Sequence, residues 1–359
     1  MTTIPEREDN LTARIDQAHK DRAERPRAHF GASQAGHPCD RWLWLSFRWA
    51  VQPDFPGRIL RVFRRGHHEE DWIVADLKAA GIKITHTGRT QKRVGFGWHI
   101  SGSLDGIIER GVPEAVHKQH VAEFKTHSLK SFKDMVAKGV EKSKPIHYAQ
   151  VQLYMHGTKI DRALYVAVCK DDDQLYFERV RYDKAFAEKL LDRCIGIVKA
   201  ERMPDPLSAD PSWYQCKFCD AHEFCHESKI TKHVNCRTCA FSTPEENGTW
   251  LCERHQESGI PEEFQHDGCA SHVLHPDLVP WEMEASFSPD EAVYIIDGKP
   301  IRNGEAGSAH VFTSKELIAG GNACANDLVN AIKETFSGAA IVCKRDGTSE
   351  VIYGKAEKD

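Results

Sequence analysis

Two carboxylates and a lysine carry the clearest chemical signal in the chain. Asp105 lies in the segment GSLDG, and Glu123 and Lys125 lie in AEFKT. Glu123 and Lys125 are two residues apart in a run of strand-forming residues, so both side chains project from one face of the strand. Mg²⁺ and Mn²⁺ prefer carboxylate oxygens, and they polarise a phosphate and lower the pKa of a bound water. The three residues therefore predict a metal-assisted hydrolytic site.

Polar residues before and after this group extend it. Upstream, the segment RGHHEED places His67, His68 and Glu70 in a helical pattern. Downstream, Gln150 and Tyr154 are four residues apart in AQVQLY, so a helix carries both on one face. Each of these residues alone is better explained as an ordinary surface or packing residue. It is the family resemblance described below that makes the five elements together favour a functional set.

The elements that must position these residues follow an α/β pattern. Asp105 ends a strand-type run between Gly102 and Gly106, which allows a close approach of backbone or ligand. The predicted elements are an amphipathic helix at 58–81, strands within 82–89, 96–109 and 119–126, a helix at 145–157, a hairpin turning at 170–174 and a helix at 183–203. This order predicts an α/β core with the carboxylates at one rim of a sheet.

Asp105 followed by Glu123-x-Lys125 resembles the motif of the PD-(D/E)XK nuclease superfamily, with Leu104 where the motif's name has Pro. The segment RGHHEED and the Gln-x-x-x-Tyr element resemble the RecB-like and lambda-exonuclease-like branch. The resemblance covers residues 30–226. It implies a restriction-endonuclease-like core, in which helices flank a mixed central sheet.

The resemblance also implies roles for these residues. Asp105, Glu123 and the backbone carbonyl of Phe124 would bind Mg²⁺ or Mn²⁺, and Lys125 would orient the attacking water or stabilise the charged transition state. Glu70 is the preferred further ligand. The alternatives to Glu70 are His67 and His68, and the residues that would contact DNA near the cut are Gln150 and Tyr154.

A first cysteine group combines Cys216-x-x-Cys219-x5-Cys225 with the distant Cys39. Three thiolates in one short segment are one short of a closed metal site. The arrangement resembles iron–sulfur nucleases, namely the CRISPR-associated four-cysteine family and the AddB-type subunit. It implies a [4Fe–4S] cluster that fastens the N-terminal segment to the end of the nuclease core. Zinc at the same four cysteines is the alternative.

A second cysteine group begins with Cys236-x-x-Cys239 and continues with Cys252-x-x-His255. Two short ligand pairs separated by a connector are typical of a tetrahedral Zn²⁺ site. Cys269 lies further along, and the spacing alone leaves His255 and Cys269 as alternative fourth ligands.

The remaining cysteines and the tryptophan-rich run have simpler explanations. No paired ligands accompany Cys169, Cys194, Cys324 and Cys343, which are expected to be small buried hydrophobic residues. Base stacking is one interpretation of the run RWLWLSFRWAV, but packing in a core is favoured. Its tryptophans are Trp42, Trp44 and Trp49.

A basic stripe is a candidate DNA contact. Arg58, Arg61 and Arg65 recur at helical spacing, so they lie on one side of the predicted helix and could face phosphates. A solvated helix face explains the same pattern equally well. The formal net charge of −5 does not itself indicate nucleic-acid binding.

Length and composition limit the overall organisation. The 359 residues, of which 40% are hydrophobic, are enough for one large or several ordinary domains. We expect a polar leader at 1–29, an iron–sulfur nuclease domain at 30–230, a zinc-ribbon-like module at 231–280 and a small α/β region of unknown role at 281–359. No apolar run is long enough for a membrane span or a signal peptide, which predicts a cytoplasmic protein without a membrane partner.

The resemblance implies a metal-dependent DNA exonuclease, of a kind reminiscent of phage-encoded enzymes. It would process DNA ends for recombination, repair or phage replication, with DNA as substrate and a single-strand annealing or recombination protein as a partner. Two other classes of function are compatible with the motifs. One is a non-catalytic DNA-binding scaffold held together by metal centres, and the other is a redox-responsive iron–sulfur protein.

Overall fold

The structure is a computed structural model that describes residues 10–284, 291–305, 311–336, 339–343 and 349–352. The chain divides into two compact units. Unit 1 consists of Met1–Pro38 and Pro53–Gly196, and unit 2 consists of Cys39–Gln52 and Ile197–Asp359. The domain boundaries predicted from the sequence do not coincide with this division and remain predictions.

A mixed five-stranded sheet forms the centre of unit 1. Its order is β2-β5-β6-β7-β8, in which β6 and β7 are parallel and the other neighbours are antiparallel. The strands are β2 (Lys83–Thr85), β5 (Gly106–Arg110), β6 (His120–His127), β7 (Arg162–Cys169) and β8 (Leu175–Arg181). The α/β expectation for this region is confirmed.

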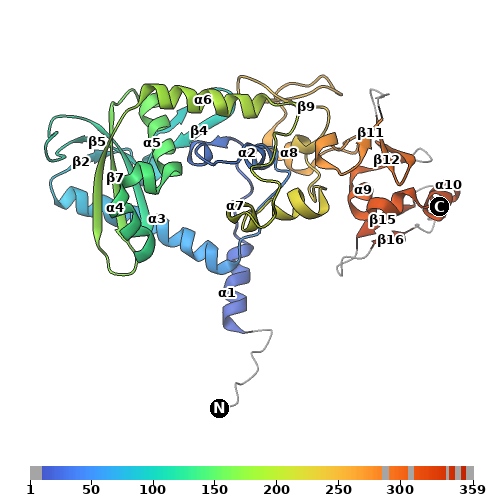
Figure 1. The fold of residues 1–359 in the computed structure, drawn as a ribbon, viewed down its shortest axis with the longest axis horizontal. Coiled ribbons are helices and arrows are strands. Elements are labelled where there is room, and N and C mark those ends of the chain that lie inside the picture. The colour runs from blue at the N-terminus through green and yellow to red at the C-terminus, as the bar shows by residue number, and fades with distance from the viewer. Residues whose placement is uncertain (1–9, 285–290, 306–310, 337–338, 344–348, 353–359) are drawn as a thin grey trace, which may run out of the picture. The chain divides into compact units, whose positions relative to one another are not determined.

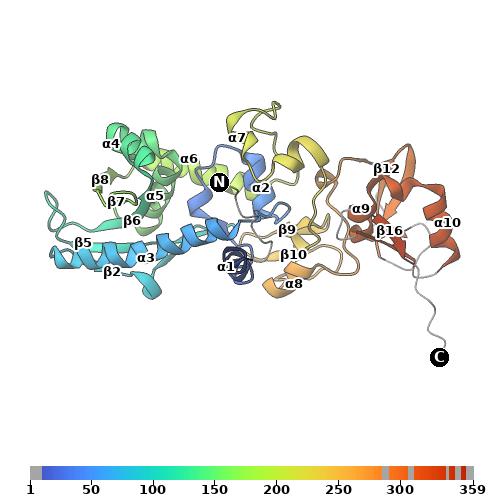
Figure 2. The same ribbon diagram turned by 90° about the horizontal axis from the view of Figure 1, so that it is seen from below.

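Helices cover both faces of this sheet (Figures 1 and 2). On one face lies α3 (Gly57–Ala79), whose Ile73 and Leu77 pack against Phe124 of β6 and Val166 of β7. On the other face lie α4 (Leu129–Ser143) and α5 (Pro145–Thr158), which connect β6 to β7. Because side chains alternate along a strand, Glu123 faces away from the apolar layer beneath α3.

Unit 1 also contains a smaller, three-stranded sheet. Its order is β1-β4-β3, formed by β1 (Phe30–Gly31), β4 (Ile100–Ser103) and β3 (Arg93–Gly95). The sequence predicted one strand over 96–109, but the chain leaves this sheet after Ser103 and enters the central sheet at Gly106. Asp105 therefore lies at the junction of two sheets, a position that the strand pattern did not show.

The other helices of unit 1 agree with the sequence pattern. Pro145 occupies the first turn of α5, where its missing N–H costs nothing. The remaining elements are α1 (Leu11–Lys20), capped by Asn10, the short turns η1 (Ala32–Gln34) and η2 (Gly88–Thr90), and α6 (Lys184–Lys199), which runs into unit 2.

The tryptophan-rich run forms α2 (Asp40–Phe47) in the core of unit 2. Trp44 and Trp49 are fully buried, which confirms the core interpretation for these two side chains, whereas Trp42 is half-buried. The guanidinium of Arg237 lies 3.7 Å from the ring centre of Trp49. The short elements nearby are α7 (Tyr214–Lys217), η3 (Phe224–Ser228), η4 (Cys236–Thr238), β9 (Ser242–Pro244), β10 (Trp250–Cys252), α8 (Glu262–Asp267) and η5 (Pro276–Leu278).

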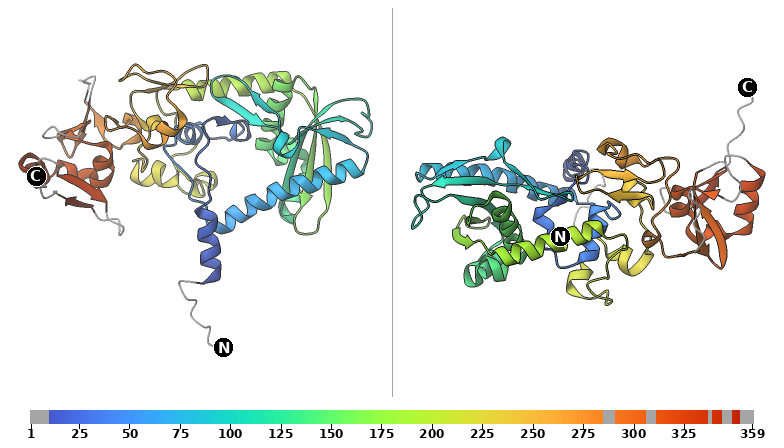
Figure 3. Two further views of the ribbon diagram at one scale, coloured as in Figure 1. Left: turned by 180° about the vertical axis from the view of Figure 1, so that it is seen from behind. Right: turned by 90° about the horizontal axis from the view of Figure 1, so that it is seen from above.

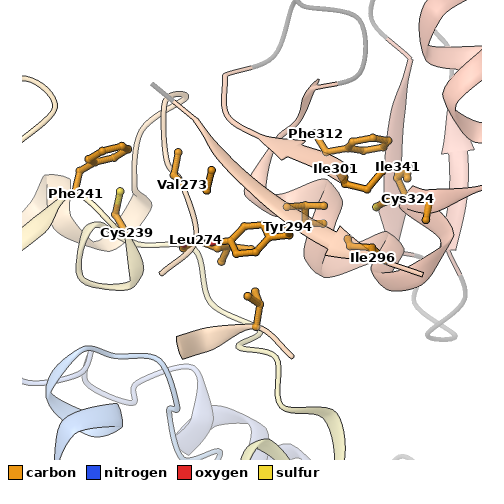
Figure 4. Packing of buried hydrophobic residues seen from close by; sticks show 14 residues of the cluster. Cys239, Phe241, Val273, Leu274, Tyr294, Ile296, Ile301, Phe312, Cys324 and Ile341 are labelled. Carbon is orange, nitrogen blue, oxygen red and sulfur yellow. Dashed lines mark hydrogen bonds between the residues drawn. The ribbon is translucent and has the colours of Figure 1, made fainter. Parts of the chain in front are cut away.

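The last part of unit 2 is a small α/β region, as the sequence predicted. A sheet of order β11-β12-β13-β14 packs with α9, and a separate hairpin pairs β15 with β16. The elements are β11 (Glu282–Met283), β12 (Ala292–Ile296), β13 (Lys299–Asn303), β14 (Val311–Phe312), α9 (Ser314–Gly320), η6 (Gly321–Ala325), α10 (Asp327–Thr335), β15 (Ala340–Cys343) and β16 (Ser349–Ile352). Figure 4 shows Tyr294 and Phe312 of this region in one apolar cluster with Leu274 and Cys239.

Two further predictions concern burial and membranes. Cys169, Cys194 and Cys324 are buried, as predicted, whereas the side chain of Cys343 lies outside the described residues. Within the described segments, no helix combines the length and the apolar character that crossing a membrane requires.

Candidate active site

Four of the predicted site residues come together in unit 1. Glu123 and Lys125 lie on β6, Asp105 lies between β4 and β5, and Glu70 lies on α3. Figure 3 shows the ribbon that carries these segments from two further sides. The charges of Asp105 and Lys125 both influence Glu70, so the helix residue belongs to the same group. The fold thus unites segments that are more than 50 residues apart in the chain.

A backbone hydrogen bond holds Asp105 in this group. The amide N–H of Phe124 donates to Oδ2 of Asp105 at 2.7 Å. Phe124 lies between Glu123 and Lys125 on β6, so the bond ties the sheet junction to the strand that carries both residues. This contact makes Asp105 a fixed member of the site.

Glu123 is fully buried and only partly satisfied. One carboxylate oxygen, Oε1, forms an ion pair with Nζ of Lys125. The other oxygen, Oε2, is buried and has no hydrogen-bond partner among the described residues. An unpaired buried carboxylate oxygen is costly, which favours a site made to receive a further cation or donor.

The electrostatics show carboxyl groups crowded together in a desolvated place. Burial and then the charge of Asp105 raise the pKa of Glu70 to about 7. Burial also raises the pKa of Asp105 and of Glu123, although Lys125 acts in the opposite direction on both. Burial alone would lower the pKa of Lys125, but Glu123 and Asp105 outweigh it and raise that pKa. Lys125 is therefore cationic at neutral pH.

The two histidines before Glu70 differ in position. His67 is close enough to Asp105 to help lower the pKa of that carboxyl. Both histidine side chains are exposed, and Glu70 is half-buried. The geometry favours Glu70, with His67 as the nearer of the two alternatives.

Gln150 and Tyr154 share one face of α5, as their spacing predicts, and both are buried. The hydroxyl of Tyr154 donates to the carbonyl oxygen of Ser103 at 2.8 Å, and Nε2 of Gln150 donates to that hydroxyl at 3.3 Å. A Cβ on Gly102 would lie 2.7 Å from the Tyr154 hydroxyl, so only glycine allows this approach. The pair braces the end of β4 just before Asp105, and contact with DNA remains a prediction.

A second polar layer beside Lys125 was not predicted from the sequence. The hydroxyl of Tyr165 lies 3.1 Å from Nε2 of His127 and 2.7 Å from Nδ1 of His147. Tyr165 is the register partner of Glu123 in the parallel β6–β7 pair. Only that pairing could have revealed this layer, because Tyr165 lies 42 residues after Glu123 in the chain.

Two arginines of the predicted basic stripe bind other residues of unit 1. Arg61 forms an ion pair with Asp16 of α1, and Nη2 of Arg65 donates to the carbonyl oxygen of Lys170 at 2.9 Å. Arg58 is exposed. A DNA-binding role for these arginines remains a prediction.

The first cysteine group (Cys39, Cys216, Cys219 and Cys225) gathers within unit 2. Burial raises the pKa of Cys219 to about 11, and the neighbouring Cys225 and Cys39 act in the same direction. Cys39 and Cys216 likewise contribute to the raised pKa of Cys225. The distant Cys39 has therefore joined the three cysteines near residue 220.

The second cysteine group also gathers in unit 2, and it includes Cys269. Both Cys252 and Cys269 influence Cys236 and Cys239 electrostatically. His255 is exposed on the turn after β10.

To bind a metal ion, the carboxyl group of unit 1 would have to rearrange locally. Among the residues that the structure describes, no group of three or more His, Cys, Asp or Glu side chains is already arranged to hold a metal ion. The donor set nevertheless fits a hard divalent cation, because it consists of crowded carboxylates and the unpartnered Oε2 of Glu123. Glu123 would have to loosen its ion pair with Lys125 to bind such an ion.

Comparisons with known proteins give little further guidance. No family model and no curated protein matches the chain. Among solved structures it is similar to SSO0001, with 16% identity, a TM-score of 0.36, and coverage of 60% of this chain and 93% of that one. It is also similar to an alkaline exonuclease (LHK-Exo) from Laribacter hongkongensis, with 16% identity, a TM-score of 0.36, and coverage of 52% and 90%. The same exonuclease in complex with dAMP has 15% identity and a TM-score of 0.35. At these TM-scores the similarity establishes neither a shared fold nor a shared activity.

Proposed function

We propose that unit 1 is the catalytic domain of a Mg²⁺- or Mn²⁺-dependent deoxyribonuclease. The observation that supports this most strongly is the convergence of Asp105, Glu123, Lys125 and Glu70 from three segments, with one buried oxygen of Glu123 left without a partner. A buried group of this kind is unfavourable for folding, which favours a role in binding and chemistry.

The carboxylates of Asp105, Glu123 and Glu70, with the carbonyl of Phe124, would hold the ion. A divalent cation there supplies charge neutralisation at the phosphate and a more acidic bound water. Asp105 reaches this position because the Phe124 amide orients it. Glu123 contributes the oxygen that has no protein partner.

Lys125 supplies the fixed positive charge of the site. Its raised pKa keeps the ammonium protonated, so it is available to orient a water or to stabilise negative charge that develops on the phosphate. Gln150 and Tyr154 keep the end of β4 in place and so maintain the position of Asp105. Direct attack by water on the phosphodiester needs no covalent intermediate.

We further propose that the substrate is DNA and that cleavage proceeds from ends, to leave single-stranded tails for recombination, repair or phage replication. The support is the order of the RGHHEED, Asp105, Glu123-x-Lys125 and Gln150-x-x-x-Tyr154 elements, which resembles end-processing nucleases. A single-strand annealing or recombination protein is the partner that such a product would serve.

Incubation with defined DNA substrates tests this function. Full-length protein with Mg²⁺ or Mn²⁺ should degrade linear duplex DNA and leave covalently closed circles intact. Glu123→Gln should abolish degradation, whereas Glu141→Gln, a change at an exposed position on α4, should not. Cleavage of closed circles would instead indicate an endonuclease. Protein that binds DNA but cleaves no substrate with either ion would favour the scaffold function.

We also propose that the first cysteine group binds a [4Fe–4S] cluster, supported by the proximity of Cys39 to Cys219 and Cys225. Protein purified without oxygen should contain about four iron and four sulfide ions per chain and show visible absorption. Cys216→Ser should remove both. Zinc without iron would show that these thiolates bind zinc instead.

A further inference from the structure

The first two thiols of the second cysteine group lie on one tight turn. The side chain of Asn235 accepts hydrogen bonds from the N–H groups of Arg237 at 3.0 Å and Thr238 at 3.2 Å. The N–H of Cys239 donates to the carbonyl oxygen of Cys236 at 3.1 Å. A tight turn that carries two thiols three positions apart is a common half of a tetrahedral metal site.

The β9–β10 hairpin brings the third thiol to this turn. Cys252 pairs in register with Ser242, which is three residues after Cys239. After β10 the chain folds back, and Cys252 exchanges two backbone hydrogen bonds with Glu257, at 2.8 and 3.1 Å. Cys252 therefore begins a second tight turn.

Backbone contacts bring the fourth thiol to the same place. Residue 274 forms a β-bridge with Cys239, so the chain after Cys269 runs beside the first turn. Gly268, with φ +65°, precedes Cys269, and a Cβ there would lie 3.5 Å from Cα of Asn235. The segment that carries Cys269 is thus in contact with the first turn at both ends.

The backbone contacts therefore bring the segments that carry the four thiols to one part of unit 2.

We propose that Cys236, Cys239, Cys252 and Cys269 bind one Zn²⁺ as four thiolates, and that His255 is not a ligand. Each thiol releases its proton to solvent when its sulfur binds the ion. Among the described residues, no three or more His, Cys, Asp or Glu side chains are already arranged to hold a metal ion. Zinc binding therefore draws the four cysteine side chains closer together. This site does not depend on the nuclease function of unit 1.

His272 connects the zinc site to the α/β region of unit 2. It follows Cys269 by three residues, and its Nε2 lies 3.0 Å from the carbonyl oxygen of Asn235. Its Nδ1 lies 2.8 Å from Oγ of Ser314, the first residue of α9. Cys239 also belongs to the apolar cluster of that region (Figure 4). The zinc site therefore organises the packing of residues 235–275 with the sheet that follows.

Alkylation of the native full-length chain tests the ligand set without any substitution. Cys269 is exposed, so as a free thiol it should react rapidly with a maleimide. In zinc-loaded protein, peptide mass spectrometry should find Cys269 unmodified, together with the other three proposed ligands. After removal of zinc by a chelator, Cys269 should become modified, while Cys194 and Cys324 stay protected by burial.

Two variants separate the alternative fourth ligands. Cys269→Ser should lower the zinc content of the purified chain by about one ion, because a closed site loses a ligand. The matched change His255→Ala should leave the zinc content unchanged. Because a difference between variants is measured, metal in the first cysteine group does not affect the result.

Three outcomes would overturn the proposal. Rapid modification of Cys269 in zinc-loaded protein would exclude it as a ligand. Loss of zinc from His255→Ala but not from Cys269→Ser would assign the histidine. Wild-type protein that neither contains zinc nor binds added Zn²⁺ would refute a zinc site. So would a Cys269→Ser variant that has lost iron, and not zinc, relative to wild type.

Discussion

Units 1 and 2 use buried polar groups in opposite ways. In unit 1 regular strands bring Asp105 and Glu123 into a desolvated group that raises the pKa of both carboxyls. In unit 2 short segments surround Arg237, which stacks on Trp49 and donates to the carbonyl of Phe47 at 3.1 Å. The carboxyl groups of unit 1 are crowded together in a desolvated place, whereas the buried guanidinium of unit 2 holds short segments together.

This difference predicts opposite responses to substitution. Loss of a charge in unit 1 should remove activity and leave the fold intact, because the scaffold is a hydrogen-bonded sheet with an apolar layer beneath α3. Loss of a polar contact in unit 2 should reduce stability, because little regular structure is available there to replace it.

The largest effect should follow Asp105→Asn. The asparagine oxygen can still accept from the Phe124 amide, but the site loses a negative charge for metal binding. DNA cleavage should fall ~100-fold or more, since metal binding provides several kcal/mol of transition-state stabilisation. Asp134→Asn, at a half-buried position on α4 where the carboxylate pairs with Lys138, is the matched control and should cleave normally. If Asp105→Asn also lowers the thermal midpoint of unfolding enough to unfold the protein under assay conditions, the loss of cleavage reflects lost stability. That result would contradict the expectation that charges in unit 1 serve activity and not folding.

Arg237→Ala should destabilise unit 2 by ~3 kcal/mol. The change removes the stacking on Trp49 and hydrogen bonds to Phe47 and to Oε1 of Gln265 at 3.0 Å. Urea unfolding followed by tryptophan fluorescence suits this measurement, because six of the eight tryptophans belong to unit 2. Lys299→Ala, which breaks only an exposed ion pair with Asp327, should cost less than ~1 kcal/mol. Equal effects would show that burial of the arginine does not matter.

Acidification should affect unit 2 more than unit 1. Burial lowers the pKa of His272 to about 4, below its unfolded value of about 6.5, so the folded state binds fewer protons. The contribution of neutral His272 to the free energy of unfolding is fully present above pH 6.5 and is lost as the pH falls toward 4. At pH 5 the loss is about 2 kcal/mol. Burial also lowers the pKa of His275, so this histidine likewise destabilises folded unit 2 in acid.

Unit 1 contains some groups that destabilise the folded state in acid and others that stabilise it. Burial lowers the pKa of His127 to about 4 and of His147 to about 3, so these histidines also disfavour the folded state in acid. The raised pKa of Glu70 and of Glu123 has the opposite consequence, because these carboxyls favour the fold as they become protonated. Hydrogen exchange of each unit between pH 7 and 5, without added metal, measures the difference. His272→Gln should flatten the profile of unit 2 and His255→Gln should not; an unchanged slope in His272→Gln would assign the loss to another cause.

Tyr154→Phe should have the smallest effect. It removes the 2.8 Å hydrogen bond to Ser103 but keeps the ring in its buried position. Stability should fall by ~1 kcal/mol and cleavage by no more than about tenfold, because Asp105 is still held by the Phe124 amide. Tyr182→Phe, which loses a hydrogen bond to His156 elsewhere in unit 1, should cleave as wild type. A ~100-fold loss in Tyr154→Phe would indicate a direct role for the hydroxyl.

The local patterns of unit 1 were predictable from the sequence. The helix of residues 57–79, the shared face of Glu123 and Lys125, and the i, i+4 pair of Gln150 and Tyr154 all follow from helix and strand periodicity. The break between β4 and β5 did not, because the residues on both sides of Asp105 have the same strand-forming character. Which sheet a strand joins depends on partners far away in the chain.

The sequence by itself determined the residue types at positions 105, 123 and 125 and the shared face of Glu123 and Lys125, since alternation of side chains along a strand is a property of the backbone. Tertiary structure alone decided three further points. It placed Tyr165 beside Glu123 through the parallel β6–β7 register, and it brought Cys39 and Cys269 to their respective cysteine groups. It also left Oε2 of Glu123 buried without a partner. Such contacts join residues that no local period connects, so only the packed fold determines them.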